Sequence, residues 1–129
     1  MTNKLIIDAV NDKIFFMVIK NDNKYIITYE NNKNNYEKLS LLIHDFLRSK
    51  SLDLSKISQI YVNKGPGSFA GIRNSLSVVK AMHLVNKIDY YCFSFTDFIG
   101  ENEAEYENVP NLCKKFKIKK NLINPIYLS

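Results

Sequence analysis

Three runs rich in β-branched and aromatic residues open the chain, with only turn-forming residues between them. The runs are KLIIDAV (residues 4–10), IFFMVI (14–19) and KYIITY (24–29). Residues 11–13 and 21–23 separate them, and gaps of this length suit hairpins, so we predict an antiparallel meander. IFFMVI shows no polar alternation, which predicts a central strand covered on both faces.

Helix and strand patterns then alternate as far as about residue 100. Apolar residues spaced by three and four after NNKNN predict one helix over 36–49. ISQIYV (57–62) and YYCFSF (90–95) predict two further strands, and residues 69 to about 86 predict a long helix. The order βββ-α-β-α-β predicts an α/β fold with a mixed five-stranded sheet, the order of a single RNase H-like or actin-kinase-type (ASKHA) lobe.

Composition bounds the number of domains and the compartment. With 129 residues, 46% of them hydrophobic, the chain suits one soluble domain. It has no apolar run of the ~18 residues that a membrane span needs and no cleavable leader, so we expect a cytoplasmic protein without membrane contact. Cys92 and Cys113 lack metal-site spacing and are expected to be packing residues.

The composition changes beyond Gly100. We expect a lobe over residues 1–100 and a shorter segment, 101–129, that packs on the lobe or trails from it. ENEAEYE (101–107) is acidic, whereas residues 114–120 hold five lysines interleaved with two apolar residues. Such a run can bind RNA, but a solvated amphipathic edge is the commoner explanation. The net charge of +5 adds little, because sixteen of the eighteen basic residues are lysines in a chain equally rich in asparagine.

Three of the four glycines stand together in NKGPGSFAGIRNSL (63–76), between a predicted strand and a predicted helix. A glycine-rich turn at a helix N-terminus can hold phosphate, because unpaired N–H groups point out of it. It can equally be a tight turn without a ligand, in which Ser68 caps the helix. The candidate residues for a ligand or partner loop are Lys64, Gly65, Pro66, Gly67, Ser68, Phe69, Gly71 and Arg73.

Catalytic and metal patterns are missing from the sequence. Actin-kinase-type enzymes place a glycine after the aspartate of their first hairpin, but AVND follows Asp8 here. His44 and His83 stand alone, without HxxxH or HExxH spacing. We therefore expect no catalytic residue, no metal and no cofactor.

GPGSFAGIRNSLSVVKAM resembles the GPGSFTGLR signature of the TsaB (YeaZ) family, and LIIDAV is similar to that family's first strand, LAIDTA. The resemblance covers about residues 3–100. It implies a non-catalytic partner of the enzyme TsaD in threonylcarbamoylation of adenosine 37 in tRNAs that read ANN codons. Typical members look nearly twice as long, yet INPIYLS resembles the family's closing PxYLR, so the second lobe is expected to be reduced or missing.

The resemblance also implies the working surface and partners. In the family, two helices pack against the equivalent pair of the partner, and the matching segments here are 36–49 and 69–86. A TsaD homologue is the implied partner in a heterodimer, with a TsaE homologue joining through the complex, a homodimer in isolation, and tRNA bound only indirectly or weakly. The alternative is a stand-alone nucleotide- or RNA-binding protein that uses the glycine turn and the lysine-rich tail. The nominated interface residues are Tyr36, Leu39, Ile43, Leu47, Val78, Met82 and Val85.

Overall fold

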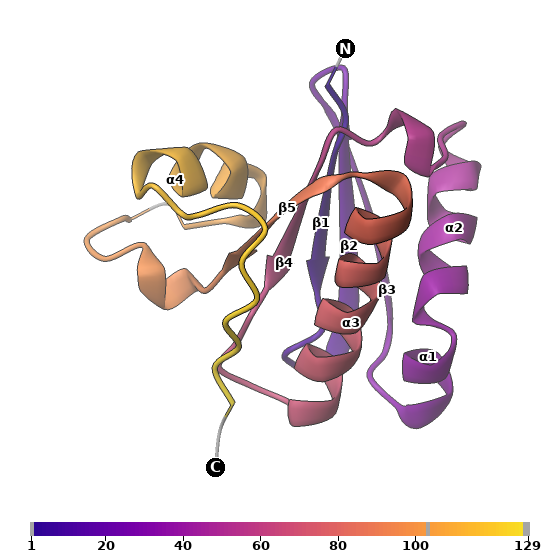
Figure 1. Cartoon of the computed structure of the whole chain (residues 1–129), viewed down its shortest axis with the longest axis horizontal. Coiled ribbons are helices and arrows are strands. Elements are labelled where there is room, and N and C mark those ends of the chain that lie inside the picture. Colours follow the sequence, from indigo (N-terminus) through magenta and orange to yellow (C-terminus); the bar gives the residue numbers. More distant parts are fainter. Residues whose placement is uncertain (1, 103, 128–129) are drawn as a thin grey trace.

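A five-stranded sheet runs through the middle of the molecule and carries helices on both faces (Figure 1). The computed structural model describes residues 2–102 and 104–127. The strand order is β3-β2-β1-β4-β5. The strands are β1 (Lys4–Asp8), β2 (Lys13–Lys20), β3 (Asn23–Glu30), β4 (Gln59–Asn63) and β5 (Asp89–Phe93).

The sheet is mixed, as predicted. β1 pairs antiparallel with β2, and β2 pairs antiparallel with β3, which confirms the meander. β1 and β4 pair in parallel, as do β4 and β5. Side chains of β2 pack alternately on both faces: Phe16 lies in the core under one helical layer and Met17 in the core on the opposite face, which confirms that β2 is covered on both sides.

The first helical layer consists of α1 (Lys33–Glu37), α2 (Leu39–Ser49) and α3 (Phe69–Asn86), which together cover one face of the sheet (Figure 1). The prediction of one helix over 36–49 is wrong, because the chain leaves the helical conformation at Lys38 (φ −118°, ψ 26°). Asn32 starts α1 before the apolar pattern begins, since its side chain accepts the backbone N–H of Asn35.

Helix α3 has the predicted bounds. Its sheet-facing side combines large apolar residues with the small Gly71 and Ser75, and it ends at Lys87 in the left-handed conformation (φ 57°). No helix among the described residues is long and apolar enough to cross a membrane.

The opposite face of the sheet carries a smaller layer around α4 (Val109–Lys115) (Figure 1). Val109 and Leu112 pack there against Ile6 and Phe93 from the sheet. The sequence analysis predicts no helix here. Pro110 is compatible with one because it stands in the first turn, where its missing N–H would have no intrahelical partner.

The chain from about residue 120 to 127 returns along β5 toward the start of α3 (Figure 1). Asn121 and Tyr90 bond each other twice: the backbone N–H of Asn121 donates to the carbonyl of Tyr90 (2.8 Å), and the N–H of Tyr90 donates to the side-chain oxygen of Asn121 (2.9 Å). Farther along, the N–H of Ile126 donates to the carbonyl of Lys64 (2.7 Å). This returning segment therefore covers the outer edge of β5 and reaches the glycine turn.

Candidate functional site: the glycine turn and the helical layer

The glycines of the turn are required by close backbone contacts. A Cβ atom at position 71 would lie 1.8 Å from the carbonyl oxygen of Ala9, and one at position 67 would lie 2.4 Å from that of Val10. Gly65 has a φ of +115°, and a Cβ there would lie 2.1 Å from the carbonyl oxygen of Ile126. The turn is therefore clamped between the end of β1 and the returning segment, and side chains would push these three backbones apart.

Ser68 caps α3, as predicted, because its hydroxyl accepts the backbone N–H of Gly71 (3.2 Å). The hydroxyl of Tyr36 lies 3.3 Å from the same oxygen, which ties α1 to the start of α3. Tyr36 and Ser68 are thus brought together, although Tyr36 was assigned to the partner surface and Ser68 to the loop.

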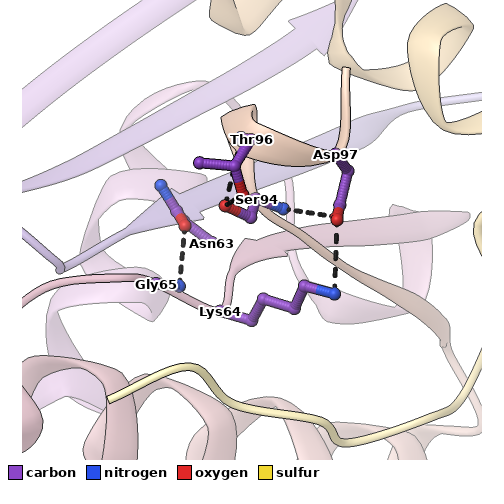
Figure 2. A network of polar contacts seen from close by, with 6 residues as sticks. All are labelled: Asn63, Lys64, Gly65, Ser94, Thr96 and Asp97. Atoms are coloured by element: carbon purple, nitrogen blue, oxygen red, sulfur yellow. Dashed lines mark hydrogen bonds and ion pairs between the residues drawn. The ribbon is translucent and has the colours of Figure 1, made fainter. Parts of the chain in front are cut away.

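The two basic residues that flank the turn have different surroundings. Lys64 is 8% exposed, and its ammonium lies 3.4 Å from the carboxylate of Asp97, which also accepts the backbone N–H of Ser94 (Figure 2). Arg73 is exposed on α3. Lys64 is therefore committed to an ion pair across β4 and β5 and does not face the solvent side of the turn.

Asp8, the aspartate of the first hairpin, is 2% exposed and fully engaged. Its carboxylate accepts the backbone N–H of Val10 (3.0 Å), the side-chain amide of Asn63 (2.9 Å) and the hydroxyl of Tyr106 (2.6 Å). Asn63 in turn accepts the N–H of Gly65 (2.9 Å; Figure 2). Burial and the Asp8 carboxylate raise the pKa of the Tyr106 hydroxyl, so it stays protonated as a donor. This network joins both faces of the lobe.

A cavity of about 520 Å³ lies beside the turn, where a phosphate would be expected. Its wall includes Asn11, Asp12, Asn31 and Ser68, but neither Lys64 nor Arg73. Since the lining side chains carry one carboxylate and no cation, they do not favour an anionic ligand.

The cysteines behave as packing residues, as predicted. Both are free and buried, Cys92 on β5 in the core under α3 and Cys113 on the buried side of α4. Burial raises the pKa of the Cys92 thiol to about 11 and that of Cys113 to about 12, so neither is a thiolate at neutral pH. Within residues 2–102 and 104–127, no group of three or more His, Cys, Asp or Glu side chains is placed to hold a metal.

The nominated interface residues divide into two groups. Four of them are buried in the core of this chain, two are partly buried, and Val85 alone is largely exposed, at 78%. The buried ones are Leu39, Ile43, Leu47 and Met82, and the partly buried ones are Tyr36 and Val78.

Further large apolar side chains are exposed on the same helical layer. Leu41 on α2 is 55% exposed, Leu84 on α3 is 63% exposed, and Phe69 at the start of α3 is 55% exposed and contacts the ring of Tyr127. Leu41 and Leu84 are not among the residues predicted for the interface, because they lie outside the main apolar stripe of each helix. The signal that finds them is an apolar residue outside the stripe of an amphipathic helix.

The meander, the parallel addition of β4 and β5, and helices on both faces define a single lobe of the RNase H-like, actin-kinase type. A family model described as "TsaD: tRNA N6-adenosine threonylcarbamoyltransferase" matches residues 24–115, more than half of the chain. The tRNA threonylcarbamoyladenosine biosynthesis protein TsaB of Buchnera aphidicola subsp. Baizongia pistaciae (strain Bp) is 34% identical over 67 residues, which are 52% of this chain and 30% of that protein. The chain belongs to the family that this model describes and, within that family, to the TsaB (YeaZ) group.

Solved structures agree on the fold. YeaZ from Pseudomonas aeruginosa matches with a TM-score of 0.67 at 19% identity, over 73% of this chain and 44% of that chain. RuvC from Thermus thermophilus matches with a TM-score of 0.51 at 10% identity, over 92% of this chain and 82% of that chain. The chain thus spans less than half the length of the YeaZ and TsaB relatives that it matches.

Proposed function

We propose that this chain acts in the biosynthesis of threonylcarbamoyladenosine in tRNA, as a non-catalytic subunit that binds a TsaD-type enzyme. Support comes from its family and from the name of the Buchnera relative. The product would be the modified adenosine 37 of tRNAs that read ANN codons. A TsaE-type protein would join through the complex, and the work would take place in the cytoplasm.

The observation that carries the binding role is the exposed apolar surface of the helical layer. Leu41, Leu84 and Val85 are each more than half exposed and stand on helices whose opposite sides fill the core. Large apolar side chains that are exposed on this layer favour a protein partner, which removes them from water. The same surface would serve self-association when the enzyme is absent.

The contacts of Asp8 support the absence of catalysis. Its two carboxylate oxygens already accept three hydrogen bonds inside the lobe. A general base must lie within reach of a substrate proton, and a nucleophile must reach a substrate atom. The burial of this carboxylate, which is 2% exposed, and its three internal donors favour a structural role for Asp8.

The test is reconstitution with the TsaD-type and TsaE-type proteins of the same organism. We expect the pure chain alone to hydrolyse no ATP and to modify no tRNA, and we expect tRNA modification by the other proteins to require it. A complex should form between this chain and the TsaD-type enzyme in size-exclusion chromatography. Turnover by the lone chain that Asp8→Ala abolishes would contradict the non-catalytic role, and unchanged modification without the chain would contradict the proposal as a whole.

The alternative of a stand-alone nucleotide- or RNA-binding protein has support only in its lysine-rich part. The cavity at the glycine turn lacks basic groups, whereas two lysines of the run 114–120 line a different cavity.

A further inference from the structure

A second cavity, of about 540 Å³, lies at the other end of the sheet from the glycine turn. Thr2, Lys4 and Gln59 line it from the starts of the parallel strands β1 and β4, while the turn follows the end of β4. Its other wall comes from α4 and the residues after it, on the face opposite α1, α2 and α3 (Figure 1). The cavity is thus separate from both the turn and the proposed partner surface.

One wall of this cavity is aromatic. The rings of Tyr61 and Tyr91 are stacked, with centroids 5.1 Å apart and planes inclined by 12°. Tyr61 is 4% exposed and donates its hydroxyl to the side chain of Gln59 (3.1 Å), and burial raises the pKa of that hydroxyl, so Tyr61 stays neutral. Aromatic side chains of this kind hold nucleic-acid bases by stacking, and the amides of Gln59 and Asn111 add donors and acceptors beside them.

The charge at the cavity is positive and uncompensated. Lys4, Lys114 and Lys117 line it, and no carboxylate does. None of the three forms an ion pair with any residue in the described part of the chain, whereas the nearby Lys115 and Lys120 pair with Glu101 (2.8 Å) and Asp89 (3.5 Å). Within the lysine run, Lys115 and Lys120 are thus paired with carboxylates, whereas Lys114 and Lys117 line the aromatic cavity.

We propose that this cavity binds a phosphorylated nucleoside, with the base against the half-buried Tyr91, which the buried Tyr61 backs, and the phosphate among Lys4, Lys114 and Lys117. Its volume lies within the range of roughly 300–1,000 Å³ typical of small-molecule sites. A free nucleotide and an unpaired residue of RNA present the same chemistry, and the site would take either. The proposal does not depend on the proposed partner enzyme.

The experiment is a calorimetric titration of the full chain at low salt. Four ligands are compared: AMP, adenosine, inorganic phosphate and the unpaired tetranucleotide of adenylate. We expect AMP to bind about tenfold more tightly than adenosine or phosphate. Only AMP has both a base to stack on the aromatic ring and a phosphate to contact the lysines. The double variant Lys114→Gln, Lys117→Gln should weaken AMP binding about tenfold. Both side chains are exposed, so the variant should fold, which circular dichroism checks.

Lys119→Gln is the matched control, because Lys119 is an exposed lysine of the same run that does not line the cavity. We expect it to change AMP affinity less than about twofold. If the tetranucleotide binds more tightly than AMP and the double variant weakens that binding, the ligand is RNA. If AMP binds and the tetranucleotide does not, the ligand is a free nucleotide. No saturable AMP binding, or an equal loss in Lys119→Gln, would overturn the proposal; binding unaffected by Tyr91→Leu in a folded variant would overturn the role of the aromatic wall.

Discussion

The glycine residues of the turn act mainly by letting backbone segments approach one another closely. Gly71 lets α3 approach Ala9, Gly67 lets the turn approach Val10, and Gly65 makes room for Ile126. The sequence analysis left open whether the glycines hold an anion or form a tight turn. Packing explains these three glycines, and the ion pair with Asp97 explains the burial of Lys64.

Replacing Gly71 should therefore cost stability even though alanine favours helices. We expect Gly71→Ala to lower the free energy of unfolding by about 3 kcal/mol, because its methyl group meets a backbone carbonyl that cannot rotate away. Urea unfolding followed by circular dichroism measures it. Gly100→Ala is the control: its φ of +84° costs about 1 kcal/mol, but no atom lies within 4 Å of the added methyl group. Equal losses in the two variants would show that crowding at Ala9 is not the reason for Gly71.

At the scale of elements, the local sequence is sufficient to predict a helix or strand where a single apolar pattern runs through the segment. The strands and α3 were predicted because their apolar patterns are uninterrupted and bounded by turn residues. The break at Lys38 could not be predicted, because the apolar spacing continues across it. α1 starts at the Asn32 cap, and the buried side of α2 starts only at Leu39. Contacts between distant segments, such as Asp8 with Tyr106 and Asn121 with Tyr90, leave no periodic signal in the sequence.

The returning segment can be tested through Asn121, whose side chain bonds the backbone of β5 at the edge where a neighbouring strand would otherwise pair. Asn121→Gly removes the acceptor of the Tyr90 N–H and the donor to Asp89 (3.0 Å) while tolerating the φ of +61°. We expect a loss of about 1–2 kcal/mol in the free energy of unfolding and faster hydrogen exchange at the Tyr90 amide. Asn124→Gly, which removes an exposed side chain of the same segment, should leave that amide protected. Unchanged exchange in Asn121→Gly would contradict the edge-covering role.

The whole molecule presents two faces with different properties. Large apolar side chains are exposed on both, with Leu84 and Val85 on the layer of α1, α2 and α3 and Ile26 and Ile99 outside it, whereas the basic, aromatic cavity lies beside α4. The chain spans less than half the length of its TsaB and YeaZ relatives, so we assign its binding roles from its own surfaces. We therefore propose a protein partner for the exposed side chains of α2 and α3 and a nucleotide for the basic cavity.

The most direct test of the central claim is the Kd of the complex with the cognate TsaD-type enzyme, measured for the parent chain, Val85→Arg and Ile26→Arg. Both residues are exposed apolar side chains, at 78% and 55%, but Val85 lies on α3 and Ile26 on the edge strand β3. With folding confirmed by thermal melting, the account predicts that Val85→Arg raises the Kd about 30-fold or more, as expected for a buried anchor, and that Ile26→Arg changes it less than about twofold. Parent-like binding by folded Val85→Arg, or an equal loss in Ile26→Arg, would contradict the assignment of the helical layer to the partner.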